Sequence, residues 1–210
     1  MLRATLLAVA GLLSLAVAAP PGPGAANIAG RQQPCLDDGS AQRIAENFRT
    51  LITNYSNQSA AAFLTVDFLD YSDGVNILIN KGCPNGPQAL GSPTFSSLEE
   101  FQAGQGSQVN IPFEILNVWH GCDFVTMRWR SSAPEANDIQ PQQPVTGIVV
   151  LEVCQGGSPE PWVIDTVYSE FNSGAWLYDK GFFKPEGCDA TQAKLRRSLG
   201  LLIDGAVRML

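Results

Sequence analysis

Four short apolar segments between residues 113 and 171 constrain the fold of this chain most strongly. They read FEILNVWH, FVTMRWRSS, VTGIVVLEVC and WVIDTVYSEF, and each is rich in β-branched and aromatic residues. Residues 121–123, the proline-rich residues 132–144 and residues 155–161 separate them. This order predicts a meander of four antiparallel strands.

Helical patterns precede the strands. Apolar residues recur at helical spacing between polar ones at Ile44, Phe48, Leu51, Ile52 and Tyr55. We expect Asp38 or Ser40 to cap this amphipathic helix. A helical turn at residues 59–63, a strand-like stretch at 66–73, a loop at 80–96 and a short helix at 97–101 should follow. Helices followed by a meander predict an α+β domain whose helices cover one face of the sheet.

The first 18 residues have the order of a secretory signal peptide. Arg3 precedes an apolar run from Ala4 to Val17, and Ala16 and Ala18 fit the cleavage pattern. The run is shorter than the roughly 20 residues that span a bilayer, so we expect no membrane span. Residues 19–34 should form a flexible mature N-terminus and residues 35–188 one domain. In residues 189–210, apolar residues recur at helical spacing, so we expect a C-terminal tail that is helical. It is either a docked or frayed terminal helix, or a helix that binds a membrane surface or a partner. Because of the signal peptide, we expect the protein to be secreted and extracellular.

Five cysteines follow the predicted cleavage point. In an oxidising compartment they should form disulfides, and their spacing matches no zinc pattern. If the second and third strand segments pair so that partner numbers sum to about 276, Cys122 faces Cys154 across the hairpin. We predict this disulfide and a second one between Cys35 and Cys83, which leaves Cys188 unpaired.

Two N-glycosylation sequons begin at Asn54 and Asn57, so we expect sugars on this part of the surface. The chain has 13 Lys and Arg against 20 Asp and Glu, which argues against a nucleic-acid partner. It contains no G-x-S-x-G, P-loop, G-x-G-x-x-G or H-E-x-x-H motif. We therefore expect neither a metal nor a cofactor.

The segment FEILNVWHGCDFVTMRWRSS, together with the leading helix and a strand that ends in acidic residues, resembles the nuclear-transport-factor-2-like superfamily. The resemblance is greatest to its SnoaL-like and ketosteroid-isomerase-like branches. The hairpin pattern of that group is matched, at or within one residue, by Glu114, Leu116, Val118, Gly121, Asp123, Val125, Arg128, Trp129 and Arg130. The segments VDFLDYSDGVN and YSEFNSGAWL also resemble secreted fungal members.

The resemblance implies a cone-shaped fold, in which a curved antiparallel sheet wraps around the N-terminal amphipathic helix and encloses a mostly apolar pocket. It further implies a homodimer formed through the sheet as one mode of assembly. The fold hosts enzymes, binders and scaffolds alike, so it does not by itself select a function.

In the isomerase-like members of the resembled superfamily, a carboxylate at the end of the first strand acts as a base. Asp73 matches that position, and Asp70 matches it less well. Strand alternation places Asp70 and Asp73 on opposite faces, so only one of them can enter a pocket. The interpretation that we prefer is that both are turn acids before Gly74.

His120 is the only histidine and a candidate proton carrier, with Tyr71 as another candidate partner of the base. His120 also adjoins a turn, where a polar residue needs no further role. The expected pocket aromatics are Phe48, Trp119, Trp129 and Tyr168. The leading hypothesis is a pocket for a small apolar molecule. The alternatives are an isomerase, cyclase or dehydratase that transfers protons there, and a secreted interaction or effector-like protein.

Overall fold

The structure is a computed structural model that describes residues 34–135 and 141–182. The predicted signal peptide, residues 19–33, Cys188 and the C-terminal tail lie outside the described residues. No helix in the described ranges is long and apolar enough to cross a membrane. The elements in chain order are α1 (Asp38–Thr53), α2 (Asn57–Phe63), β1 (Leu64–Tyr71), α3 (Asp73–Ile79), α4 (Leu98–Gly106), β2 (Glu114–His120), β3 (Phe124–Ser131), β4 (Val145–Gln155), β5 (Trp162–Phe171) and α5 (Ser173–Asp179).

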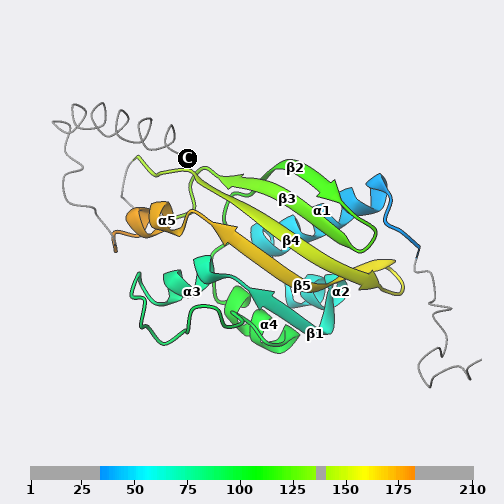
Figure 1. The fold of residues 1–210 in the computed structure, drawn as a ribbon, viewed down its shortest axis with the longest axis horizontal. Coiled ribbons are helices and arrows are strands. Elements are labelled where there is room, and N and C mark those ends of the chain that lie inside the picture. The colour runs from blue at the N-terminus through cyan, green and yellow to red at the C-terminus, as the bar shows by residue number, and fades with distance from the viewer. Residues whose placement is uncertain (1–33, 136–140, 183–210) are drawn as a thin grey trace, which may run out of the picture. The chain divides into compact units, whose positions relative to one another are not determined.

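The strands form one open sheet in the order β1-β5-β4-β3-β2 (Figure 1). The four predicted meander strands pair antiparallel, which confirms the α+β class. The sheet is mixed rather than wholly antiparallel, because β1 runs parallel to β5 along the opposite edge from β2. This pairing brings the end of β1 beside the end of β5, where the candidate site lies.

The register of the β3–β4 hairpin agrees with the prediction. Phe124 pairs with Glu152 and Ser131 with Val145, so the partner numbers sum to the predicted value. In β2, the register shifts between Ile115 and Asn117. A bulge of this kind reverses which residues face the core.

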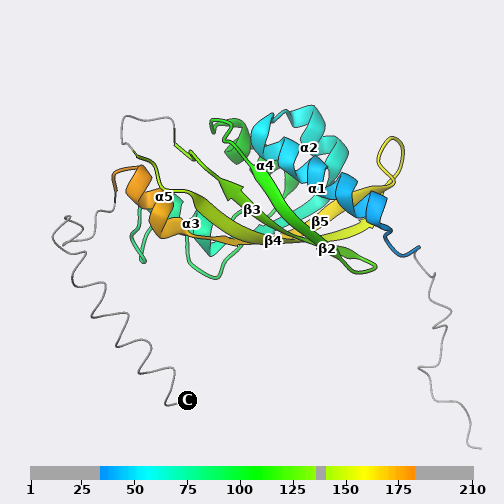
Figure 2. The same ribbon diagram turned by 90° about the horizontal axis from the view of Figure 1, so that it is seen from above.

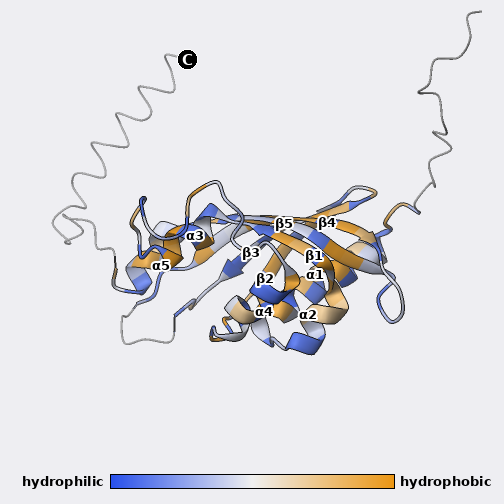
Figure 3. Cartoon of the chain, turned by 90° about the horizontal axis from the view of Figure 1, so that it is seen from below, coloured by the Kyte–Doolittle hydropathy of each residue, from blue (hydrophilic) through white to orange (hydrophobic). Residues whose placement is uncertain are grey.

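Helices α1, α2 and α4 cover one face of the curved sheet, while α3 and α5 lie at one end of it (Figure 2). Hydrophobic residues run along the strands above these helices (Figure 3). The predicted stripe of α1 is confirmed, since Ile44, Phe48 and Leu51 are buried and Ile52 and Tyr55 pack against the core. Burial of this stripe, rather than helix propensity, is what stabilises such a helix.

Capping side chains set the helix boundaries. Asp37 caps α1, one residue before the predicted position, because its carboxylate accepts from Ser40 N at 2.7 Å. The hydroxyl of Ser72 accepts from Val75 N at 3.1 Å and so starts α3 at Asp73, where the predicted strand still continued. Two predicted short helices are present and longer than expected.

Both predicted disulfides are wrong, and the structure joins Cys35 to Cys122 instead. Cys122 lies in the turn before β3, outside the hairpin ladder, and its carbonyl accepts from Leu36 N at 3.1 Å. Cys154 alternates with the buried Val153 and so points away from the core face. It is a free thiol, as is the exposed Cys83. The disulfide partner of Cys122 is therefore Cys35, which lies in the segment before α1.

Candidate functional site

Two adjoining cavities lie between the sheet and the helices. The inner chamber has a volume of about 100 Å³ and the outer chamber one of about 330 Å³. They adjoin because both are lined by Val75, Gln108, Phe171 and Trp176, among others. The inner chamber is the candidate site, since a buried acid enters it.

Aromatic rings dominate the lining of the inner chamber. Seven line it, namely Phe48, Phe95, Phe101, Phe113, Trp129, Phe171 and Trp176. Five of them form a continuous series from Phe48 through Phe113, Trp129 and Phe171 to Trp176, with ring centroids 4.7–6.2 Å apart. Phe95 and Phe101 form a second series, 5.5 Å apart. The predicted pocket positions of Phe48 and Trp129 thus lie in this wall.

A glycine makes room for the indole of Trp129. Gly147 pairs with Trp129 across β3 and β4, and a Cβ atom at Gly147 would lie 2.8 Å from Trp129 Cε2 and 2.6 Å from Phe171 Cβ. The close approach therefore requires glycine at this strand position. Trp129 Nε1 is buried without a hydrogen-bond partner among the described residues.

Asp70 is the one acid among the described residues that line the inner chamber. Asp70 is only 8% exposed, and its Oδ1 is buried with no hydrogen-bond partner in the described parts of the chain. Its backbone is fixed against the loop after α3, because Asp70 N donates to Phe95 O at 2.9 Å and Thr94 N to Asp70 O at 2.7 Å. The backbone of Asp70 is thus fixed at the end of β1, while its Oδ1 has no partner among the described residues.

Burial, and secondarily the negative charge of Glu170, raises the pKa of Asp70 to about 7. Glu170 is fixed at the start of α3, where its carboxylate accepts from Asp73 N at 3.0 Å and Gly74 N at 3.1 Å. A carboxyl group with this pKa exchanges its proton near neutral pH. It can therefore either donate or accept in that range.

Asp73, the better sequence match to the base, lies outside the chamber. It is exposed, and its carboxylate accepts from Gly91 N at 2.6 Å and from Asn76 Nδ2 at 3.4 Å. Asp73 is thus an exposed residue at the start of α3 that binds the loop near Gly91, rather than an acid of a local turn. The face of β1 that enters the protein is the one with Phe68 and Asp70, which are both buried.

Tyr71 and Tyr168 also lie away from the chamber. Their rings stack at 5.4 Å on the face of the sheet opposite the helices, and Tyr168 is 44% exposed. Trp119 is 52% exposed, since the bulge in β2 turns it outward. The proposed pocket roles of Trp119 and Tyr168, and the proton-donor role of Tyr71, therefore do not match their positions.

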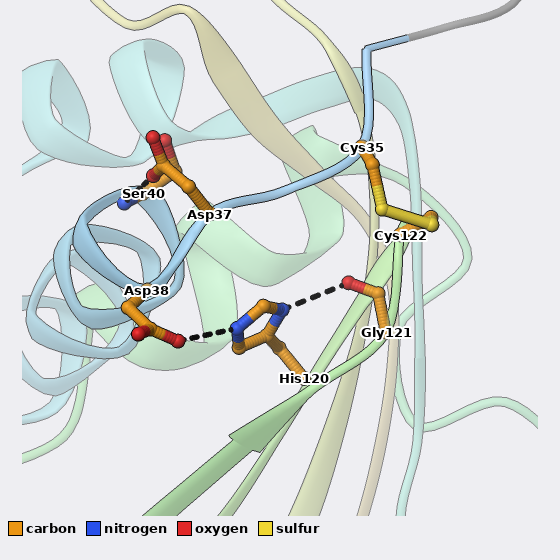
Figure 4. A network of polar contacts seen from close by, with 7 residues as sticks. All are labelled: Cys35, Asp37, Asp38, Ser40, His120, Gly121 and Cys122. Atoms are coloured by element: carbon orange, nitrogen blue, oxygen red, sulfur yellow. Dashed lines mark hydrogen bonds and ion pairs between the residues drawn. A yellow bond between two sulfur atoms is a disulfide. The ribbon is translucent and has the colours of Figure 1, made fainter.

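His120 lies near the N-terminus of α1, apart from the residues that line the inner chamber (Figure 4). Its Nε2 is 3.0 Å from Asp38 Oδ1 and its Nδ1 is 3.0 Å from Gly121 O. The Cys35–Cys122 disulfide lies beside this contact (Figure 4). The arrangement fastens the start of α1 to the β2–β3 turn, and nothing places His120 beside Asp70.

Sequence reasoning missed several residues around the chambers. Gln105, Gln108 and Ser169 are polar residues of the inner chamber. In the outer chamber, Trp176 Nε1 donates to Glu135, whose carboxylate also lies 2.6 Å from Lys180 Nζ. Gly147 is the single glycine inside the predicted strand VTGIVVLEVC, and a glycine in a strand is a recognisable signal of close packing. No comparable sequence pattern marks Gln105 and Gln108. No cluster of metal-binding side chains occurs within the described residues.

A family model described as NTF2-like domain matches residues 34–183. No curated protein matches the chain. Among solved structures, a hypothetical protein with a ketosteroid isomerase-like fold from Catenulispora acidiphila, solved in complex with trimethylamine, is 12% identical with a TM-score of 0.47. The match covers 68% of this chain and 97% of that protein. A SnoaL-like protein from Burkholderia thailandensis is 13% identical with a TM-score of 0.45, covering 66% and 98%. IdmH from Streptomyces antibioticus is 12% identical with a TM-score of 0.46, covering 67% and 98%. Likeness at this level carries no argument about ligands or activity.

Proposed function

The chain belongs to the NTF2-like domain family, and from that premise we propose that it binds a small, mostly apolar molecule in the inner chamber. The observation that carries the proposal is Asp70 Oδ1, which is buried at a chamber lined by aromatic rings and has no hydrogen-bond partner among the described residues. Buried polar groups in folded proteins nearly always have hydrogen-bond partners, and the exceptions concentrate at functional sites. A bound molecule with one polar group would supply the missing partner.

The volume limits what enters. A cavity of about 150 Å³ is known to hold benzene, so the inner chamber of about 100 Å³ suits a group of about four heavy atoms. Any remaining part of the ligand would extend into the outer chamber. The walls are apolar apart from a few polar groups, which is the usual composition of a small-molecule site.

A chamber-filling variant tests this proposal. Val75 lines both chambers, so Val75→Phe should abolish the binding of small neutral probes such as phenol and 3,3-dimethylbutan-1-ol, measured by NMR chemical-shift titration. Val66→Phe is the matched control, because Val66 is 75% exposed on β1. Equal binding by the two variants, or no binding of either probe by the wild type at millimolar concentration, would contradict the proposal.

Proton-transfer chemistry is the second candidate, favoured by the raised pKa of Asp70. A carboxyl group that titrates near 7 suits a general acid or base at neutral pH. The unpartnered Trp129 Nε1 on the same chamber wall is a candidate donor to a substrate oxygen. Wild-type protein should then accelerate deuterium exchange next to the carbonyl of small ketones, with a rate inflection near pH 7. Asp70→Asn should remove the acceleration, whereas the exposed Asp67→Asn should keep it.

We also propose that the protein is secreted and glycosylated. The support is the order of residues 1–18 and the exposure of Asn54 and Asn57 at the junction of α1 and α2. After expression in a eukaryotic secretory host, the protein recovered from the culture medium should begin at Ala19. Its mass should fall on treatment with an N-glycan-removing enzyme, and each Asn→Gln variant should lose one glycan.

An interaction role through the uncovered sheet face is a third proposal, with a second copy of the chain as the partner. On this face Ile148 is 52% exposed between Arg128 on β3 and Glu170 on β5. A twofold axis through Ile148 would set Arg128 of each copy opposite Glu170 of the other. Sedimentation at several concentrations should reveal a dimer that Arg128→Glu disrupts and Arg128→Glu with Glu170→Arg restores.

A further inference from the structure

We propose that the inner chamber recognises an organic cation, a small alkylated ammonium group held between the Asp70 carboxylate and the two series of aromatic rings. This inference rests on the proposed ligand-binding function and names the chemical class of the ligand. It goes beyond that function, because an apolar pocket alone would not distinguish cations from neutral or anionic molecules.

The aromatic lining supplies the first argument. The faces of aromatic rings carry partial negative charge and attract cations, and cages of several rings are a recurrent means of binding alkylated ammonium groups. Here seven rings line a chamber of about 100 Å³. A trimethylammonium group presents apolar methyl surface to such rings and still carries a full charge.

The carboxyl group supplies the second argument. No described residue donates a hydrogen bond to Asp70 Oδ1, and no Lys, Arg or His is among the residues that line the inner chamber. The nearest cation of the cavity system is Lys180 in the outer chamber, which is paired with Glu135. A carboxylate in this position lacks a counter-ion that a cationic ligand would provide.

The surrounding charge argues against an anionic ligand. Glu170 on β5 acts on Asp70 with the same sign of charge, and Asp73 on α3 lies at the same end of β1. The remaining lining residues from α1, α4, β3 and α5 are uncharged. The chain as a whole has a formal net charge of −7. Together these groups create a negative potential that attracts cations and repels anions.

Choline and 3,3-dimethylbutan-1-ol provide a test that changes one atom, since carbon replaces the charged nitrogen while the shape is kept. At about pH 8, where Asp70 is mostly ionised, calorimetric titration of the full chain should show choline binding on the order of tenfold or more tightly than the alcohol. Asp70→Asn should abolish the preference. Asp67→Asn removes the same charge from an exposed site on the same strand and should retain it.

The pH dependence has a definite sign. Choline requires the ionised carboxylate, so its affinity should rise as the pH increases through about 7, with release of a proton on binding below that pH. The affinity of the alcohol should stay level or fall over the same range. Repeating the titration with Glu170→Gln should shift the choline profile towards lower pH, because the like charge that opposes ionisation of Asp70 is gone.

The outcomes separate the inference from the function on which it rests. If the alcohol binds as tightly as choline, and Val75→Phe removes both, the chamber binds ligands but the cation inference is wrong. If choline binds equally well to the wild type and to Asp70→Asn, the inference is also wrong. If neither probe binds, the ligand-binding function falls together with the inference.

Discussion

Asp38 Oδ1, at the first residue of α1, lies 3.0 Å from Nε2 of His120, the last residue of β2. The other ring nitrogen faces the carbonyl oxygen of Gly121 at 3.0 Å. A carboxylate and a carbonyl are both acceptors, so the ring satisfies both only as an imidazolium. The hydrogen bond with Asp38 is the main cause that raises the pKa of His120 above 6.5.

His120 should therefore stabilise the fold most at low pH. A raised folded pKa gives stability that is fully present below about pH 6.5 and is lost as the pH rises through the folded value. The free energy of unfolding lost in His120→Gln should be larger at about pH 5.5 than at about pH 8.5, as measured by urea denaturation. An equal loss at both values would contradict this, and Asp38→Asn should lower the pKa seen for the single imidazole by NMR.

Asp70 should also make the folded state less stable as the pH rises, because its folded pKa is raised as well. Its folded pKa of about 7 exceeds the ordinary 3.8, so the folded state loses stability relative to the unfolded state as the pH rises between these values. The difference between a pKa of about 7 and one of 3.8 corresponds to at most about 4 kcal/mol. Asp70→Asn should thus gain stability relative to the wild type from about pH 4 to about pH 7, with Asp67→Asn as the control. Parallel profiles for wild type and Asp70→Asn in thermal melts would count against a buried acid.

The Cys35–Cys122 disulfide should contribute substantially to stability, because it spans 87 residues. Cys35→Ser and Cys122→Ser, made as single variants, each break this disulfide and should each lose ~2–5 kcal/mol of unfolding free energy. Cys83→Ser changes a free thiol and should be nearly neutral. Denaturation in the presence and absence of a reductant measures this. Peptide mapping of the unreduced protein should recover the Cys35–Cys122 link, and recovery of Cys122 linked to Cys154 would refute the pairing.

Two ion pairs of α1 should differ in strength. Both Nε and Nη2 of Arg43 donate to Glu160 at 2.8 Å, and the Glu160 side chain is only 8% exposed. Arg43→Met should cost ~1–3 kcal/mol, since it leaves a buried carboxylate without its guanidinium. Arg49→Met, which breaks the exposed pair with Glu46, should cost ~0–1 kcal/mol. Equal losses in urea denaturation would show that burial of Glu160 does not matter.

Much of the frame could be predicted because it depends on local patterns. The stripe of α1 and the four meander strands follow from periods of 3.6 and 2 residues. The β3–β4 register was predicted as well, because the turn between two consecutive strands fixes their pairing. The family resemblance gave Asp70 and Asp73 as candidate acids, and the strand alternation indicated that only one of them could enter a pocket.

The predictions that failed depended on departures from those patterns. One extra residue near Leu116 in β2 turns Trp119 outward, and no sequence signal marks that bulge. The extrapolated β3–β4 register would place Cys122 opposite Cys154, but Cys122 lies in the turn before β3 and is joined to Cys35, in the segment before α1. Pairings between segments far apart in the chain leave no local trace.

By itself, the sequence of this protein determined the α+β class, the strands, the family resemblance and the short list of acids, since each follows from residue types at short spacing. Only the tertiary structure decided which acid matters. The parallel pairing of β1 with β5, and the aromatic side chains contributed by α1, α4, β3, β5 and α5, bury Asp70, whereas Asp73 lies exposed at the start of α3. Burial without a partner depends on every surrounding element at once, so only the folded chain specifies it.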